Sequence, residues 1–148
     1  RVTSQAKRQY SDLKVGEVRQ SPALTVTEAH IVGYAGLTGD VHPIHMNADY
    51  AKASQFGDRL AQGPLVFGIG MGMLLQADPL DTIAFLGMDW KIVGPVKIGD
   101  TIHLRTTVHD MRVTSSGDRA IVTHHCEIVN QSGQVVQKGL TKVIMAVA

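Results

Sequence analysis

The sequence predicts an α+β domain in which an antiparallel sheet wraps around one long helix. Candidate helices come first along the chain, and the last of them, over residues 64–77, is the longest. Four segments rich in Val, Ile and Thr follow it, separated by short turns, as expected for strands that pair with their sequence neighbours. With 148 residues the chain has the length of one domain, so we expect a single core over residues 1–148.

The first quarter of the chain leads into a helix. Residues 13–26 are extended in character. Thr25 and Thr27 are both good N-caps, and Glu28 suits the positive end of a helix dipole. The apolar residues that follow recur at helical spacing, which predicts a helix that runs to about Leu37.

A polar segment without clear periodicity comes next, over residues 38–47. Asn47 can cap a short helix through Ser54, because its side chain can accept a hydrogen bond from the first turn. Phe56 and Gly57 end that helix. We therefore expect irregular backbone first and a short helix after it.

The longest helix opens at Gly63 and Pro64, since Pro at the first helical position loses no hydrogen bond. It extends to about Ala77, which corresponds to roughly 20 Å. The segment is apolar nearly all round, yet it carries three interior glycines, each of which costs roughly 1 kcal/mol against Ala. They are Gly68, Gly70 and Gly72. We therefore expect this helix to be buried on most sides, with its backbone close against a curved sheet.

The expected strands cover residues 82–94, 100–113, 118–130 and 134–147. Hairpin-like turns separate the last three, with Ser-Ser-Gly-Asp at 115–118 and Asn-Gln-Ser-Gly at 130–133. His124 and His125 lie on one of these strands, where neighbouring side chains point to opposite faces. We therefore do not expect these two histidines to share a metal ion.

Composition excludes several classes of protein. A formal net charge of +1 does not fit a nucleic-acid-binding surface, which is usually strongly basic. No apolar run reaches about 18 residues, so no membrane span is expected, and the polar residues 1–10 lack the apolar stretch of a signal peptide. The single Cys126 cannot form an internal disulfide, which fits a reducing cytosol. We expect a cytoplasmic protein, although the chain begins without Met and a removed targeting segment stays open.

Residues 39–64 hold the groups that can do chemistry. Asp40 and His45 are five residues apart, and Pro43 turns the segment so that both side chains can point to one place. Gly63 begins the long helix, where free N–H groups and the helix dipole favour a developing negative charge. A carboxylate, an imidazole and an N–H donor are the parts needed for proton transfer beside a carbonyl.

The same residues allow other interpretations. Asp40 and His45 are also ordinary turn residues that need no chemistry. Together with His42 they resemble a metal-ligand cluster, in which His30 or a later residue would have to supply a further ligand. We favour no metal, because no thiol lies nearby in the sequence.

This region also resembles the hydratase signature of the MaoC-like family, part of the hotdog superfamily. The signature is roughly Gly-Asp-x-Asn-Pro-x-His, a short Tyr-Ala helix, Phe-Gly and then Ala-His-Gly. Here these motifs read Gly39-Asp40-Val41-His42-Pro43-Ile44-His45, Tyr50-Ala51, Phe56-Gly57 and Ala61-Gln62-Gly63. The resemblance continues over 90–96 and 99–102, so it spans most of the chain.

The resemblance implies a hotdog fold and an active site. Its catalytic Asp and His fall on Asp40 and His45, and its backbone donor to the thioester carbonyl falls on Gly63. Two positions depart from the family pattern, since His42 replaces Asn and Gln62 replaces His. Both substitutes can hydrogen-bond, so we interpret them as changes in substrate contacts that leave catalysis in place. The further substrate-binding residues that the resemblance implies are Pro64, Phe56 and Gly57.

The implied activity is hydration of a trans-2-enoyl-CoA to a (R)-3-hydroxyacyl-CoA, or the reverse dehydration. Asp40 and His45 would act on one water molecule, and which of them is the base stays open. The CoA thioester is the substrate, no separate cofactor is expected, and subunits would pair edge to edge in a homodimer. Rival interpretations are an acyl-CoA thioesterase and a non-catalytic acyl-CoA-binding module on the same fold. Phe67, Met71 and Met73 either fill the core or line an acyl tunnel.

Overall fold

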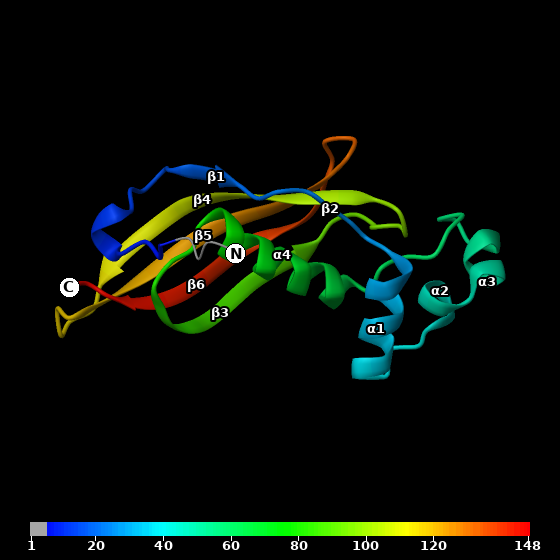
Figure 1. The fold of residues 1–148 in the computed structure, drawn as a ribbon, viewed down its shortest axis with the longest axis horizontal. Coiled ribbons are helices and arrows are strands. Elements are labelled where there is room, and N and C mark those ends of the chain that lie inside the picture. The colour runs from blue at the N-terminus through cyan, green and yellow to red at the C-terminus, as the bar shows by residue number, and fades with distance from the viewer. Residues whose placement is uncertain (1–5) are drawn as a thin grey trace.

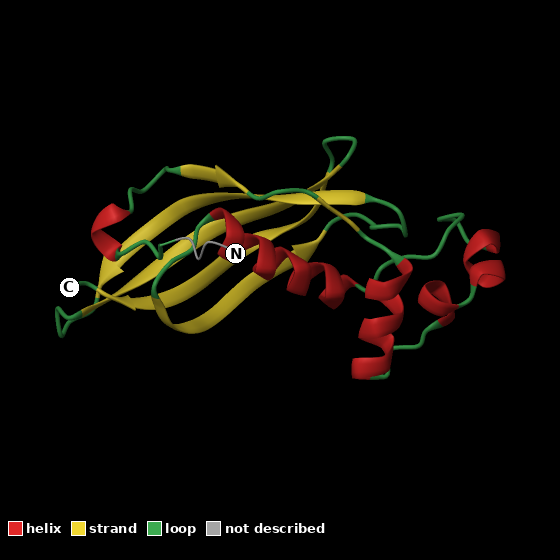
Figure 2. Ribbon diagram, in the orientation of Figure 1, coloured by secondary structure: helices red, strands yellow, loops and turns green. Residues whose placement is uncertain are grey.

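The computed structural model describes residues 6–148, so residues 1–5 of the polar N-terminal segment lie outside the described residues. The helices are η1 (Tyr10–Asp12), α1 (Glu28–Thr38), α2 (Pro43–Met46), α3 (Ala48–Ala53) and α4 (Gly63–Ala77). The strands are β1 (Val18–Gln20), β2 (Leu24–Thr25), β3 (Thr82–Ile92), β4 (Thr101–Val113), β5 (Arg119–Asn130) and β6 (Val135–Ala146). Helices come before four long strands that are joined in sequence, which confirms the α+β class (Figures 1 and 2).

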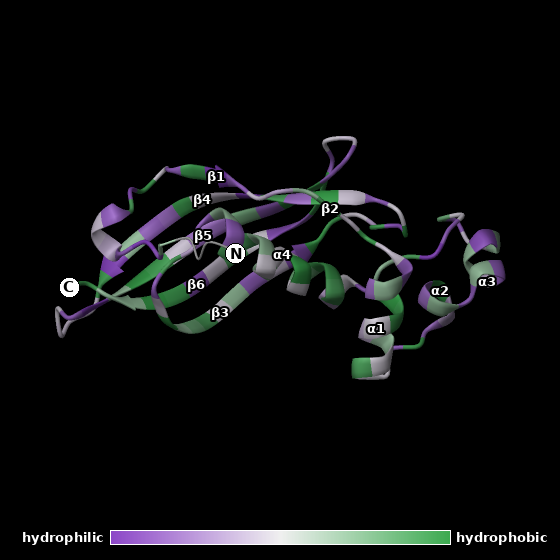
Figure 3. Cartoon of the chain, viewed as in Figure 1, coloured by the Kyte–Doolittle hydropathy of each residue, from purple (hydrophilic) through white to green (hydrophobic). Residues whose placement is uncertain are grey.

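Within the described residues the six strands form one antiparallel sheet (Figure 2). The strand order is β1-β4-β5-β6-β3, and β2 also pairs with β4. Leu104 of β4 lies opposite Ile128 of β5, which lies opposite Gln137 of β6. All three are almost fully buried, because alternate side chains on these strands point toward α4. The alternation of hydrophobic and hydrophilic residues along the strands is visible in Figure 3.

The long helix α4 lies across one face of this sheet, and one of its sides is exposed. A Cβ on Gly70 would lie 2.6 Å from Cδ1 of Ile128, so this glycine permits a close approach of helix and sheet. Gly68 and Gly72 are exposed, and a Cβ on either would meet nothing within 4 Å. The exposed residues of α4 are Pro64, Gly68, Gly72, Leu75 and Gln76, and the others are buried or partly buried, which confirms the prediction of burial on most sides. At 3.6 residues per turn, glycines two positions apart lie on nearly opposite sides of the helix.

The polar segment before α3 contains a helix that the sequence did not predict. Residues Pro43–Met46 form α2, a single turn. Four residues are too few to show a helical period, and Pro43 was interpreted as the centre of a turn. In the structure Pro43 occupies the first helical position instead, where its missing N–H breaks no hydrogen bond.

The core consists of two apolar clusters. One, beneath α4, includes Val66, Leu74, Leu104 and Ile128. The other includes Leu13, Leu80, Val122 and Met145. Along β5, the buried His124 lies between members of the two clusters, so a polar layer divides the core.

A buried charge cluster occupies this polar layer. Asp78 ends α4, its Oδ2 accepts a hydrogen bond from Nε2 of His124 at 2.9 Å, and Nη1 of Arg8 lies 2.5 Å from its Oδ1. Burial raises the pKa of Asp78, but the hydrogen bonds from His124 and Arg8 outweigh it, so the pKa lies below its ordinary value. Glu17 joins the cluster through Arg8 at 2.7 Å. The cluster ties the N-terminal segment, the end of α4 and the middle of the sheet together.

Cys126 is fully buried on β5, and burial raises the pKa of its thiol. It is a free thiol, and the cytoplasmic location that its presence suggested stays a prediction. Among the helices of residues 6–148, none combines the length and the apolar character needed to cross a membrane.

Candidate active site

The predicted catalytic residues lie at the end of the molecule where α4 begins. Figure 1 shows α1, α2 and α3 grouped beyond the end of the sheet, next to the start of α4. Asp40 follows α1, His45 lies in α2, and Gly63 is the first residue of α4. The end of α1, the helix α2 and the start of α4 thus position the three groups.

The end of α1 places Asp40. The helix stops at Gly39, whose φ of +81° is left-handed and therefore favours glycine. The N–H of Gly39 donates to the carbonyl of Ala35 at 2.8 Å, and the N–H of Asp40 donates to Oγ1 of Thr38 at 3.3 Å. These bonds hold the backbone, while the carboxylate of Asp40 makes no hydrogen bond within the described chain and its side chain is 41% exposed.

The one-turn helix α2 places His45. Its N-cap is His42, whose Nδ1 accepts a hydrogen bond from the N–H of Ile44 at 3.1 Å. The imidazole of His42 therefore caps α2 as the side chain of an Asn would, and Asn is the residue that the family pattern has at this position. The rings of His42 and His45 lie 6.1 Å apart, centre to centre.

Hydrogen bonding determines the tautomer of His45. Its Nδ1 lies 2.7 Å from the carbonyl oxygen of Leu60. A carbonyl oxygen only accepts, so Nδ1 carries the hydrogen, and Nε2 of the neutral ring has a free lone pair. Nε2 lies 3.9 Å from Oδ2 of Asp40, which is too long for a direct hydrogen bond. Two acceptors at this separation can both accept from one water molecule.

Arg59 links the segments that carry Asp40 and His45, and the sequence analysis did not identify it. Its Nε donates to the carbonyl of His45 at 2.6 Å, and its Nη1 lies 2.6 Å from Oε2 of Glu28. Only 11% of the Arg59 side chain is exposed. The bonds join α2 to α1, so they fix the distance between the elements that hold Asp40 and His45. A lone Arg in a loop has no spacing signal by which sequence reasoning could find it.

Two residues of the sheet, Gln137 and Ile92, contact Gly63. Nε2 of Gln137 donates to the carbonyl of Gly63 at 2.9 Å, and Oε1 of Gln137 accepts from Nε1 of Trp90 at 2.8 Å. A Cβ on Gly63 would lie 2.5 Å from Cδ1 of Ile92, so the contact is tight. The N–H of Gly63 is in the first turn of α4 and makes no hydrogen bond within residues 6–148.

Four further residues were predicted to bind substrate, and they differ in burial and in hydrogen bonding. Gln62 is fully buried, and its Nε2 donates to the carbonyl of Ile31 at 3.1 Å, so it joins α1 to the start of α4. Its Oε1 is buried without a partner in the described part of the chain. Pro64 is exposed, Phe56 is partly buried, and Gly57 is exposed with a φ of +72°. No hydrogen bond joins these four to the Asp–His pair in residues 6–148, and their substrate-binding roles stay predictions.

The described residues hold no group of three His, Cys, Asp or Glu side chains arranged as a metal site. Nδ1 of His42 is engaged by a backbone N–H, so it does not point to the Asp–His pair. His124 is buried beneath α4, whereas His125 is partly exposed, as expected for neighbours on a strand.

The family model of the MaoC like domain matches residues 12–129. The (R)-specific enoyl-CoA hydratase of Rhodospirillum rubrum is 35% identical over 99 residues, which are 67% of this chain and 68% of that protein. The 3-hydroxybutyryl-CoA dehydratase of Methylorubrum extorquens is 28% identical over 102 residues, which are 69% of this chain and 64% of that protein. Protein MaoC of Klebsiella aerogenes is 34% identical over 102 residues, and these make up 68% of this chain but only 30% of that protein.

Solved structures agree with the architecture. The MaoC-like dehydratase of Rhodospirillum rubrum superposes with a TM-score of 0.84 at 32% identity, covering 94% of this chain and 97% of its own. A conserved protein of Mycobacterium tuberculosis described as a double hotdog fold superposes with a TM-score of 0.86 at 18% identity, covering 96% of this chain and 45% of its own. The second likeness concerns the fold alone, and it confirms the predicted hotdog.

Proposed function

Because the chain belongs to the MaoC-like domain family, whose model matches residues 12–129, we propose that it is a hydro-lyase of acyl thioesters. It adds water to a trans-2-enoyl-CoA to give a (R)-3-hydroxyacyl-CoA, or removes water in the reverse direction. The relatives named as a hydratase and a dehydratase support this class of reaction. The observation that carries the proposal is the 3.9 Å gap between Oδ2 of Asp40 and Nε2 of His45.

In this proposal one water molecule occupies the gap and donates to both groups. One of them takes a proton as the water oxygen bonds to the β-carbon of the enoyl group. A proton then returns to the α-carbon on the same face, so the atoms of one water are added across the double bond. General acid–base assistance of this kind contributes about 10²–10⁴ in rate.

The electrons of the double bond move toward the thioester carbonyl as the oxygen attacks. The developing negative charge needs a donor, and the unpaired N–H of Gly63 at the positive end of α4 is suited to it. One such donor is commonly worth about 3 kcal/mol in the transition state. Gln137 supports this role, because its hydrogen bond to the carbonyl of Gly63 fixes the orientation of the first turn.

Incubation of the purified chain with crotonyl-CoA tests the reaction. We expect the enoyl absorbance to fall, no free thiol to appear and (R)-3-hydroxybutyryl-CoA to accumulate. Release of free thiol would identify a thioesterase, and binding of an unchanged ester would identify a non-catalytic module. Either of those results rejects the proposed function.

We also propose that a second copy of the chain pairs with the open edge of β3. This strand is the last in the sheet order, so the backbone groups on its outer side have no strand partner in the described residues. Large apolar side chains on and just after it are each about half exposed. They are Ile83, Phe85, Leu86, Met88, Ile92 and Val93. A second copy offers the same edge, and a two-fold axis lets both edges pair and cover these side chains.

Sedimentation of the wild type and of Met88→Lys tests the dimer. We expect a dimer for the wild type and a shift to monomer for the variant, because the charge would be buried in the joined sheet. Leu37→Lys is the matched control, since Leu37 is 85% exposed on α1, away from β3. A monomeric wild type would reject this part of the proposal.

A further inference from the structure

His42 supplies an acceptor to every N–H group of α2, the one-turn helix that carries His45. Its carbonyl accepts from the N–H of His45 at 2.9 Å and from that of Met46 at 3.2 Å, and its Nδ1 accepts from the N–H of Ile44 at 3.1 Å. Pro43 has no N–H to satisfy. A helix of four residues has little stability of its own, because one turn fixes several residues for few hydrogen bonds. The orientation of α2 therefore depends on this cap.

The capping atom of His42 is a nitrogen that can take up a proton, unlike the amide oxygen of an Asn. Because Nδ1 accepts from a backbone N–H, it presents a lone pair, and Nε2 carries the hydrogen of the neutral ring. Imidazole is the side chain whose protonation falls within the physiological pH range. A proton on Nδ1 turns the acceptor into a donor that faces the N–H of Ile44, so the charged ring cannot keep this bond.

The surroundings of His42 offer no bond that would hold its charged ring in place. The side chain is exposed, and the rings of His45 on α2 and Tyr50 on α3 each lie 6.1 Å from it, centre to centre and edge on. The charged side chains of the adjoining elements are Glu28 on α1, Asp40 after it, Asp49 and Lys52 on α3, and Asp58 and Arg59 before α4. Within residues 6–148 none of these carboxylates forms a salt bridge with His42. A protonated ring is therefore free to turn into solvent.

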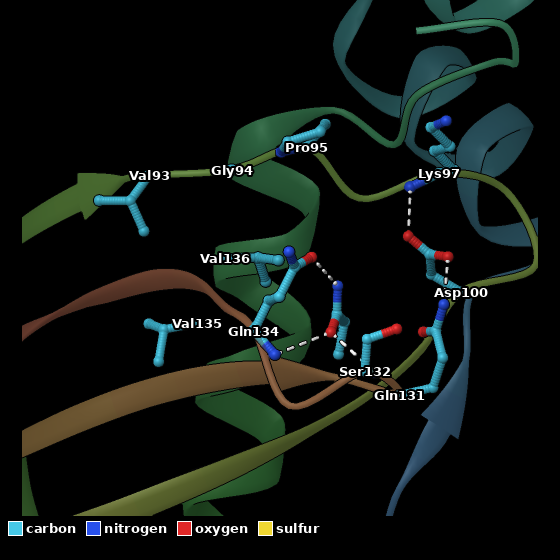
Figure 4. A pocket seen from close by; sticks show the side chains of 11 residues that line it. Val93, Gly94, Pro95, Lys97, Asp100, Gln131, Ser132, Gln134, Val135 and Val136 are labelled. Atoms are coloured by element: carbon cyan, nitrogen blue, oxygen red, sulfur yellow. Dashed lines mark hydrogen bonds between the residues drawn. The ribbon is translucent and has the colours of Figure 1, made fainter.

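The other side of α2 is held by bonds that persist when His45 is protonated. The N–H of Leu60 donates to the carbonyl of Ile44 at 3.1 Å, and its carbonyl accepts from Nδ1 of His45 at 2.7 Å. This Nδ1 carries its hydrogen in the neutral and in the charged ring. Leu60 also forms an isolated β-bridge with Lys97, in the loop that lines the pocket of Figure 4, and the N–H of Lys97 donates to Asp100 at 2.8 Å. Acidification thus acts on the cap at His42 and leaves the support at Leu60.

We propose that His42 is a positioning residue whose neutral imidazole holds α2, and with it His45, in the reactive arrangement, so that protonation of His42 releases the helix and lowers the rate. The proposal rests on the proposed function, in which Nε2 of His45 faces Oδ2 of Asp40 across 3.9 Å. His42 lies between these two residues in sequence, so loss of its cap changes their separation. An Asn at this position would cap the helix at every pH, whereas the His makes the activity of this chain sensitive to acid.

Hydration of crotonyl-CoA at about pH 8 and about pH 5.5, the range in which an exposed imidazole takes up a proton, tests the positioning role. The fall in kcat between the two pH values should be about fivefold larger in the wild type than in His42→Asn, as for loss of a typical N-cap, with no such difference in KM. His42→Ala lacks the cap at both pH values, so its fall should match that of His42→Asn. Protonation of Asp40 or His45 affects every variant, so the comparison isolates His42. His109→Asn, at an exposed position of β4, is the matched control and should fall as the wild type does.

The amide proton resonance of Ile44 reports the cap without any substrate. In the labelled wild type it should move upfield as the ring of His42 takes up a proton, because the hydrogen bond is lost, and in His42→Asn it should stay in place. A fixed Ile44 resonance during protonation of His42 overturns the proposal. Equal falls of kcat in wild type and His42→Asn overturn it as well, as does a difference confined to KM, which would mean that His42 contacts the substrate. If the wild type hydrates no crotonyl-CoA at either pH, the proposed function has failed, and the Ile44 resonance still decides whether the cap responds to pH.

Discussion

Two Asp–His pairs stand at opposite ends of α4, and they differ in separation and in exposure. At the start of the helix, Asp40 and His45 are 3.9 Å apart, with side chains 41% and 14% exposed. At its end, Asp78 and His124 are 2.9 Å apart, with side chains 1% and 2% exposed. Asp78 and His124 are joined directly and are called the closed pair, whereas Asp40 and His45 leave room between them and are called the open pair.

The difference indicates what each pair can do. Asp78 is satisfied by His124 and Arg8, so its carboxylate has no free direction in which to bind a substrate. The carboxylate of Asp40 has no partner in the described chain, and the facing nitrogen of His45 is an acceptor. Residue types alone therefore do not mark an active site. An incompletely satisfied pair near a helix N-terminus is the stronger indication.

Substitution of the open pair is expected to have the largest effect on activity. Asp40→Asn and His45→Gln should each lower kcat/KM for crotonyl-CoA by about 10²–10⁴, because each replaces a group that can take up and return a proton by an amide that cannot. The midpoint of urea unfolding should stay near that of the wild type for Asp40→Asn, since its carboxylate is partly exposed and unpaired. Asp49→Asn, an exposed residue of α3, is the control. Wild-type turnover in either variant would remove the open pair from the mechanism.

The closed pair should behave in the opposite way. Asp78→Asn leaves Arg8 and His124 without their shared carboxylate, and loss of one partner of a buried ion pair costs about 3 kcal/mol or more of unfolding free energy. The kcat of the folded variant should match the wild type, because Asp78 lies at the far end of α4. Urea unfolding and activity on the same sample measure both quantities. A variant that stayed stable but lost activity would reverse the comparison.

The fold was largely predictable from sequence because its signals are local. The alternation in the four long strands and the Pro at the start of α4 each act within a few residues, and the structure places these elements within one or two residues of the prediction. Burial of α4 on most sides was predictable from its apolar residues, but its exposed side was not, since that depends on which side of the helix meets the sheet. The turn α2 was missed because four residues show no period.

The site was only partly predictable, for a related reason. Asp40, His45 and Gly63 lie on a short stretch of chain whose motif is a local pattern. A residue that supports Gly63 comes from far along the chain, since Gln137 is 74 residues away. Only the folded sheet brings such residues together, so no spacing in the sequence indicates them.

Acid unfolding tests the role of Asp78 in the closed pair. The pKa of Asp78 lies below its ordinary value in the folded state, so the unfolded state binds more protons between the two pKa values. The stabilisation is therefore fully present above the unfolded pKa of about 4 and is lost as pH falls through the folded pKa. Below about pH 4, Asp78→Asn should lose less unfolding free energy on acidification than the wild type. Asp110→Asn, on the exposed part of β4, is the control. Equal acid dependence in Asp78→Asn and wild type would contradict the role of the closed pair.

The smallest expected effect concerns the helix that joins the two pairs. Gly68→Ala should raise the unfolding free energy by up to about 1 kcal/mol, because a Cβ there meets no atom within 4 Å and Ala favours helix. Gly70→Ala should be less stable than Gly68→Ala by about 1–3 kcal/mol, since its Cβ would lie 2.6 Å from Cδ1 of the buried Ile128 and would displace that side chain. Both variants should unfold as the same oligomer as the wild type, and chemical denaturation compares them directly. If Gly68→Ala destabilises and Gly70→Ala does not, the side of α4 that faces the sheet has been assigned wrongly.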